Sequence, residues 1–207
     1  MKAREEILQR VQSANIAATH QPVRRDYAHT VELADPVATF VERVEDYKAT
    51  VIRTGLDGVA AAVAKSLEGA RRVVVPAGFN ESWLPEGIDP VPDEPALSSE
   101  DLDGIDAVLT SATVAIAVTG TIVLDHTEGQ GRRALTLVPD LHVCVLTADQ
   151  IVGDVPEAVA RLSASVDAGR PLTWVSGPSA TVDIELIRVH GVHGPRTLRV
   201  VLVESTA

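Results

Sequence analysis

The 207-residue chain is long enough for one globular domain, and 45% hydrophobic against 23% charged residues excludes a wholly disordered protein. Its single cysteine, Cys144, excludes an internal disulfide framework and a self-contained iron–sulfur cluster, which needs about four thiolates. The net charge of −11 argues against nucleic acid and against an anionic membrane surface as partners, because both attract basic proteins.

The negative charge is concentrated in one stretch of the chain. Between Val73 and Gly131 there is no Lys or Arg, whereas eleven residues are acidic. Elsewhere the 18 basic residues are balanced by as many acidic ones. The stretch therefore predicts an acidic, solvated surface, and a docking face for a partner is the alternative.

Hydrophobic spacing predicts helices in the first third of the chain. Apolar residues follow the helical period in residues 1–14, 36–52 and about 57–69. The second of these helices has Asp35 as its N-cap, followed by a proline in the first turn. The chain between the first two helices has no such period. We therefore predict an N-terminal helix with a linker arm over 1–34 and the main domain over 35–207.

Short apolar runs then predict buried strands. They lie at residues 72–76, 105–109, 114–118, 121–124, 142–146, 172–176 and 198–203. A capping box at Asp154 and Glu157 predicts a further helix, and segment 179–189 suits either a strand or a helix. Helices that alternate with buried strands predict an α/β fold with a mainly parallel sheet flanked by helices.

A glycine-rich loop follows one of the predicted strands. Gly129 to Ala134 fits the pattern G-x-G-x-x-A, but the residues after it are a poor start for the helix that a dinucleotide site requires. A nicotinamide site is therefore not expected. The loop also contains Glu128 and the pair Arg132-Arg133, and two adjacent guanidinium groups are suited to hold a carboxylate or phosphate.

Ser179, Asp183 and His193 occur in the order of a serine hydrolase triad. The segment around Ser179 lacks the last glycine of a nucleophile elbow, because Thr181 stands in its place. A backbone turn capped by Ser179 and Thr181 explains the same residues. We regard the turn as the better interpretation.

Two smaller groups complete the candidates. His190 and His193 lack a third ligand close by, so no metal site is expected. Thr119, Gly120 and Thr121 are expected near the end of a strand, where ligands of open α/β sheets bind, and a plain turn is the alternative.

Three parts of the sequence together resemble the LUD-domain family, in particular its lactate utilisation protein C group. They are residues 119–124, residues 136–142, and residues 177–185 followed by 191–195. The resemblance extends from about residue 35 to the end of the chain. It implies a fold similar to the NagB/RpiA/CoA-transferase-like proteins. It also implies a role in the oxidation of L-lactate to pyruvate, together with partner proteins that carry iron–sulfur clusters.

The family motifs imply a set of site residues in this chain. The catalytic candidates are Glu128, Asp183, Glu185 and His193. The ligand-binding candidates from the motifs are Thr119, Gly120, Thr121, Ser179 and Thr181. The glycine-rich loop adds Arg132 and Arg133, because their guanidinium groups can hold an anion. The implied ligand is a small carboxylate or a thioester, and no cofactor is expected in this chain.

Two hypotheses follow. In the first, the chain is a non-redox, cytoplasmic subunit of a lactate-oxidising system, since it has neither a flavin or nicotinamide motif nor the thiolates for a cluster. In the second, it is a stand-alone enzyme resembling a CoA-transferase or a sugar-phosphate isomerase. That enzyme would use Glu128 or Glu185 as nucleophile or base.

Overall fold

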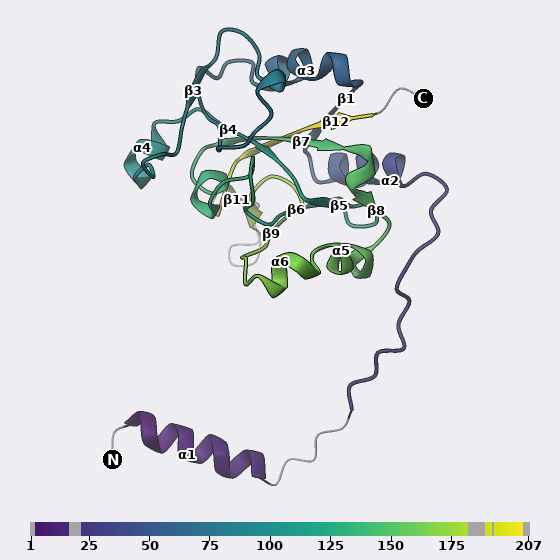
Figure 1. Cartoon of the computed structure of the whole chain (residues 1–207), viewed down its shortest axis with the longest axis vertical. Helices are drawn as coiled ribbons and strands as arrows, with labels where there is room; N and C mark the ends of the chain where they lie inside the picture. The colour runs from purple at the N-terminus through teal and green to yellow at the C-terminus, as the bar shows by residue number, and fades with distance from the viewer. Residues whose placement is uncertain (1–2, 17–21, 182–188, 192, 205–207) are drawn as a thin grey trace.

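The computed structural model describes residues 3–16, 22–181, 189–191 and 193–204. Figure 1 follows the chain from a helix that stands apart into a body of sheets and helices. The α-helices of the described residues are α1 (Ala3–Ile16), α2 (Pro36–Asp46), α3 (Val59–Ser66), α4 (Ser99–Asp103), α5 (Val155–Arg161) and α6 (Ser163–Asp167). The strands are β1 (Thr50–Thr54), β2 (Arg72–Val74), β3 (Asp89–Val91), β4 (Ala107–Ser111), β5 (Val114–Ile116), β6 (Thr121–Leu124), β7 (Leu141–Thr147), β8 (Ile151–Val152), β9 (Thr173–Val175), β10 (Ala180–Thr181), β11 (Val189–His190) and β12 (Thr197–Val203). The short 3-10 helices are η1 (Leu56–Gly58), η2 (Glu81–Trp83), η3 (Arg133–Thr136) and η4 (Ala148–Gln150).

Six parallel strands form the main sheet in the order β1-β12-β7-β4-β2-β3. The central partners β7 and β12 pair from Leu141↔Thr197 to Thr147↔Val203. Consecutive residues of β7 are buried because both faces of the sheet are covered, as parallel sheets require. The predicted α/β fold, with a mainly parallel sheet flanked by helices, is confirmed.

The first strand corrects the sequence-based helix over 36–52. Helix α2 ends at Asp46, and Lys48 adopts a φ of 70°, which turns the chain out of the helix. Residues Thr50–Thr54 then form β1, which pairs with β12 at the edge of the main sheet. Their β-branched side chains favour a strand, although Val51 also continues the helical spacing.

A second sheet has four strands in the order β8-β5-β6-β9. Strands β5 and β6 are antiparallel, and β6 also pairs antiparallel with β9. The turn between β5 and β6 contains Thr119 and Gly120, which therefore do not lie at the carboxyl end of a strand of the main sheet. The sequence predicted these strands but not their separation into a sheet of their own.

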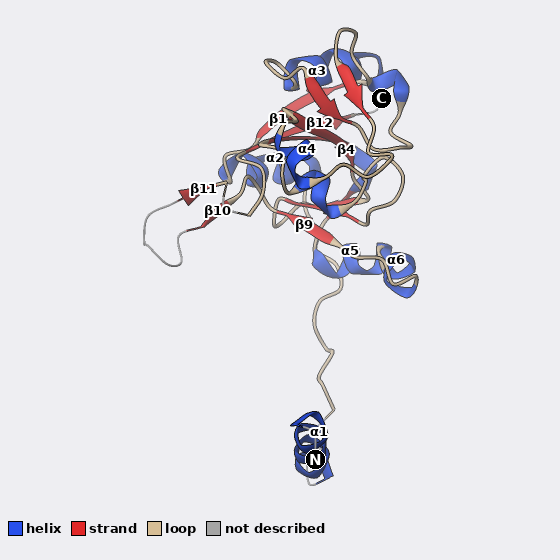
Figure 2. Cartoon of the chain, turned by 90° about the vertical axis from the view of Figure 1, so that its left-hand side faces the viewer, coloured by secondary structure: helices blue, strands red, loops and turns tan. Residues whose placement is uncertain are grey.

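Both faces of the main sheet carry a hydrophobic core. Helix α3 covers the face that presents Val143 and Val201. Helix α2 and the second sheet cover the opposite face, which presents Leu146 and Leu202. Helix α5 packs on the outer face of the second sheet, where Ile116 is fully buried. Figure 2 shows this sequence of layers from α3 to α5 and α6.

Helix α1 contributes no residue to these cores. None of its residues is buried, and Ile7 and Val11 are more than half exposed. Its bounds, Ala3–Ile16, overlap the helix expected over residues 1–14. No helix within the described ranges combines the length and the hydrophobicity that crossing a bilayer requires.

We expect Gly120→Ala to destabilise the protein by about 2 kcal/mol. Gly120 has a φ of 59°, and a Cβ there would lie 2.8 Å from the backbone of Arg43 in α2. Gly169→Ala is the matched control, because Gly169 has a φ of 69° but no atom within 4 Å of a Cβ. The control is expected to cost about 1 kcal/mol of backbone strain. Denaturant unfolding of both variants measures the difference, and equal losses would contradict the close approach.

Candidate functional site

A cavity of about 280 Å³ opens between the two sheets, at the amino ends of β7 and β12. Strand β9 of the second sheet forms the opposite wall, and η3 contributes to the rim. We call it the Arg133 pocket. Its lining residues are Arg133, Thr136, His142, residues 173–180, residues 193–195 and Leu198.

The lining combines one permanent cation with several hydroxyl groups. Arg133 contributes the cation, and Thr136, Thr173, Ser176 and Ser179 contribute the hydroxyls. No acidic residue occurs among the described lining residues. In a protein of net charge −11, a cavity with this lining is suited to a small anion.

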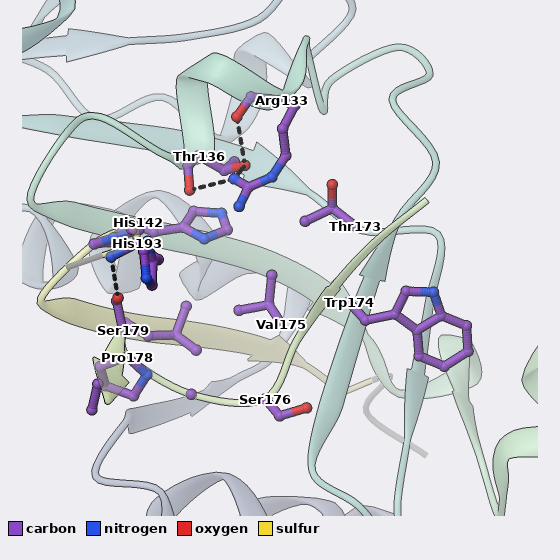
Figure 3. Close-up of a pocket in the computed structure, with 15 residues that line it drawn as sticks. Arg133, Thr136, His142, Thr173, Trp174, Val175, Ser176, Pro178, Ser179 and His193 are labelled. Carbon is purple, nitrogen blue, oxygen red and sulfur yellow. Dashed lines mark hydrogen bonds between the residues drawn. The ribbon is translucent and has the colours of Figure 1, made fainter. Parts of the chain in front are cut away.

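Only part of the hydrogen-bonding capacity of the Arg133 guanidinium is used by the described residues. Its Nη1 donates to the carbonyl and hydroxyl oxygens of Thr136, at 3.1 and 3.2 Å. Arg133 forms no ion pair with any residue that the structure describes. Figure 3 shows the side chain reaching from η3 toward the cavity, where Thr136 fixes its direction. Its remaining N–H groups are therefore available to a ligand.

His142 lines the pocket and is 1% exposed. Its Nε2 forms a 2.8 Å hydrogen bond with the hydroxyl of Thr110 on β4. Burial, with the nearby charge of Arg133, lowers the pKa of His142 to about 4. The imidazole is therefore neutral at physiological pH.

The rim joins two of the family-like segments. The Ser179 hydroxyl oxygen accepts a hydrogen bond of 3.0 Å from the backbone N–H of His193, which Figure 3 marks. The backbone N–H of Ser179 donates to the carbonyl of Pro195 at 2.8 Å. Ser179 thus has the turn-stabilising contacts expected of it, and its partner in His193 is the backbone rather than the imidazole.

The sequence profile of the LUD domain matches residues 3–203 of the chain, including α1. Over 170 residues the chain is 54% identical to Lactate utilization protein C of Deinococcus radiodurans, which covers 82% of this chain and 80% of that protein. A crystal structure of a DUF162 family protein from the same organism, at 1.70 Å resolution, matches with a TM-score of 0.72 and 47% identity. That match covers 81% of this chain and 96% of the crystallised one.

The chain belongs to the LUD-domain family. A more distant relative, an uncharacterized protein of Neisseria meningitidis serogroup B, is 27% identical over 223 residues and covers 98% of this chain and 94% of its own length. The family resemblance inferred from residues 119–124, 136–142, 177–185 and 191–195 is therefore confirmed by matches that extend beyond these motifs.

The structure of this LUD domain separates the two adjacent arginines. Arg132 forms a bidentate ion pair with Asp93, at 2.7 and 3.0 Å, and also donates to the carbonyl of Leu97. These contacts fix the acidic, proline-containing segment to the glycine-rich loop. Only Arg133 lines the pocket between the sheets.

Glu128 lies in a different cavity of the LUD domain. It is exposed, and it lines a space at the carboxyl ends of β2 and β3 together with Asp93 and Arg132. Asp183 and Glu185 lie outside the described residues. Thr181 belongs to β10, which pairs with β11.

Thr119 and Thr121 stand next to the Arg133 pocket rather than in it. The Thr119 hydroxyl donates to the Thr121 hydroxyl at 2.8 Å, and Thr121 bonds to the hydroxyl of Ser176 at 2.7 Å. Ser176 itself lines the pocket. The chain of hydroxyls thus connects the β5–β6 turn, where Gly120 packs on α2, to the rim.

A buried polar network supports the loop that carries Arg133. Asp125 accepts hydrogen bonds from the hydroxyls of Thr113, Thr127 and Ser165, at 2.6 to 2.7 Å. Gln130 accepts from the backbone N–H of Asp125 and donates to Thr113. Burial raises the pKa of Asp125, but the three hydroxyls outweigh it and lower this pKa to about 2.

His126 connects this network to the pocket wall. It adopts a φ of 59°, its Nδ1 donates to the carbonyl of Gly131 at 2.6 Å, and its Nε2 bonds to the Thr173 hydroxyl at 2.8 Å. Because Thr173 lines the pocket, His126 links the loop before Arg133 to β9.

Four residues of the pocket were not predicted from the sequence, namely Thr136, His142, Thr173 and Ser176. The family-like segment 136–142 contains the first two, and this signal was available. Thr173 and Ser176 lie around β9, and only the packing of the two sheets brings them to η3. Within the described part of the chain, no group of three His, Cys, Asp or Glu side chains is placed to hold a metal ion.

Proposed function

We propose that this protein is a non-redox subunit of a cytoplasmic system that oxidises L-lactate to pyruvate, and that it binds a small carboxylate in the Arg133 pocket. The observation that carries the binding proposal is a partly unengaged guanidinium facing a cavity whose described lining has hydroxyls and no acid. The 54% identity to a protein named Lactate utilization protein C supports the role in lactate utilisation.

These 207 residues lack the cysteines for an iron–sulfur cluster that could accept the electrons of lactate oxidation. Cys144 is the only cysteine, and burial raises the pKa of its thiol to about 12, which disfavours a metal-binding thiolate. Iron–sulfur proteins are therefore the proposed partners, and they would supply the redox chemistry. The residues of this chain would bind and orient a carboxylate.

The enzyme hypothesis assigns Glu128 or Glu185 as nucleophile or base. Glu128 lines the cavity beside Asp93 and Arg132, not the Arg133 pocket. Glu185 lies outside the described residues. Because the described lining of the Arg133 pocket has no carboxylate, we propose a binding subunit rather than a CoA-transferase-like or isomerase-like enzyme.

We expect Arg133→Gln to weaken the binding of pyruvate and L-lactate about tenfold. The variant loses the charge-assisted hydrogen bonds between Arg133 and the ligand carboxylate. The loss of affinity is limited because Arg133 is exposed to solvent, which screens the charges. Titration calorimetry on the full chain measures it. Arg132→Gln is the matched control, because it removes the same charge from the adjacent residue, whose guanidinium is engaged by Asp93. Equal loss in both variants, or no binding to the wild type, would exclude the carboxylate site.

The subunit role has its own test. A tagged protein isolated from lactate-grown cells with its partners should reduce a dye when L-lactate is added, whereas the same protein purified alone should not. Activity of the chain alone would refute the non-redox assignment.

A further inference from the structure

His142 lines the Arg133 pocket, and one of its ring nitrogens has no hydrogen-bond partner among the described residues. Its Nε2 is bonded to Thr110, and no other described residue bonds to the imidazole. His142 lines the pocket, and Nδ1 is the ring nitrogen that the Thr110 contact leaves for a ligand there.

The neutral imidazole can either donate or accept at this nitrogen. When the Thr110 hydroxyl donates to Nε2, the ring proton is on Nδ1, which then donates into the cavity. When Nε2 carries the proton, it donates a hydrogen bond to the Thr110 hydroxyl oxygen. The hydroxyl proton of Thr110 can then point to Cys144, which pairs with Thr110 on the neighbouring strand β7. Nδ1 is then an acceptor. The same side chain therefore suits a carbonyl oxygen and a hydroxyl group.

The surroundings limit the size and the apolar part of the ligand. Leu198 stands in register with His142 on the neighbouring strand, and Val175 and Pro178 line the wall beyond it. The charge of Arg133 is close enough to contribute to the lowered pKa of His142. These surroundings suit a short molecule with three parts. Its carboxylate would meet Arg133, an oxygen on the next carbon would meet His142, and a small alkyl group would lie on the apolar wall.

We propose that His142, held by Thr110, is the specificity-determining residue of the Arg133 pocket, and that its Nδ1 bonds to the oxygen on carbon 2 of a 2-oxo or 2-hydroxy carboxylate. The inference rests on the proposed function, since Arg133 must hold the carboxylate. It adds that plain carboxylates of the same size bind more weakly, because they leave the buried imidazole nitrogen without a partner.

Calorimetric titration of the full chain with pyruvate, L-lactate and propionate tests the selectivity. Pyruvate and L-lactate are expected to bind about tenfold more tightly than propionate, which lacks the oxygen on carbon 2. Equal affinities of all three would overturn the role of His142 and leave the carboxylate site intact. No binding of any of the three would overturn the proposed function as well, so the two failures are distinguishable.

Two substitutions separate the nitrogens of the imidazole. The amide of His142→Gln reaches the position of Nε2 and keeps the Thr110 contact, whereas the amide of His142→Asn takes the position of Nδ1. We expect the Gln variant to bind pyruvate and propionate equally and the Asn variant to keep part of the preference. Selectivity that persists in the Gln variant would refute the assignment.

A measurement on the wild type covers the case in which these variants do not fold. In nitrogen-15 spectra of the histidine rings, pyruvate should move the Nδ1 signal of His142, and propionate should not. The same shift with both ligands, or with neither, would contradict a bond to the oxygen on carbon 2.

Discussion

Replacing Asp125 by Ala is expected to lower the free energy of unfolding by about 3 to 4 kcal/mol. The substitution removes the acceptor of three hydroxyl hydrogen bonds, and Asp125 itself is only 4% exposed. The Ser165 hydroxyl is buried and would lose its partner. Denaturant unfolding measures the loss. Asp26→Ala, which removes the same charge from the exposed segment after α1, should change stability by less than about 0.5 kcal/mol.

The same residue predicts a pH dependence. The pKa of Asp125 in the folded protein is about 2, below its ordinary value of 3.8. The ionised form therefore contributes about 2 kcal/mol, which is fully present above pH 4 and is lost as the pH falls toward 2. In Asp125→Asn this contribution is absent. The difference between the unfolding free energies of wild type and variant should shrink over that window, and a constant difference would contradict the assignment.

Phe40→Ala is expected to cost about 3 to 5 kcal/mol. Phe40 is fully buried where α2 packs on the main sheet and the second sheet, among Ile122, Leu146 and Leu202. Truncation leaves a cavity that these elements cannot close without moving α2. Val159→Ala in α5 is the control, because Val159 is 51% exposed, and its loss should stay below about 0.5 kcal/mol. Similar losses in the two variants would show that α2 does not anchor the sheets.

Local pattern predicted most of the strands because their side chains are buried on both faces. The apolar runs at β4, β6, β7 and β12 have few polar interruptions, and their bounds agree with the predicted ones within about two residues. The pattern failed at β1, since a strand that is half-buried at an edge has apolar spacing that also suits a helix. Pairing with β12 decides between the two, and the sequence does not display such long-range contacts.

The candidate site was predictable only in part, for a related reason. Family-like motifs indicated Ser179 and His193, and the arginine pair of the glycine-rich loop indicated Arg133. All three line the Arg133 pocket. The neighbouring Arg132 has the same chemistry, and only its contact with Asp93 shows that it serves the fold. Thr173 and Ser176 line the pocket because the second sheet packs against the main sheet there. No local sequence pattern indicates how two sheets pack.

The Arg133 pocket has one wall on the main sheet and the other on the second sheet. A molecule held between β7, β12 and β9 acts as a non-covalent crosslink, because the sheets cannot separate without releasing it. Occupancy therefore adds to the free energy of unfolding, in proportion to the logarithm of ligand concentration once that exceeds the dissociation constant. The lifetime of the folded protein would then depend on the concentration of such a molecule.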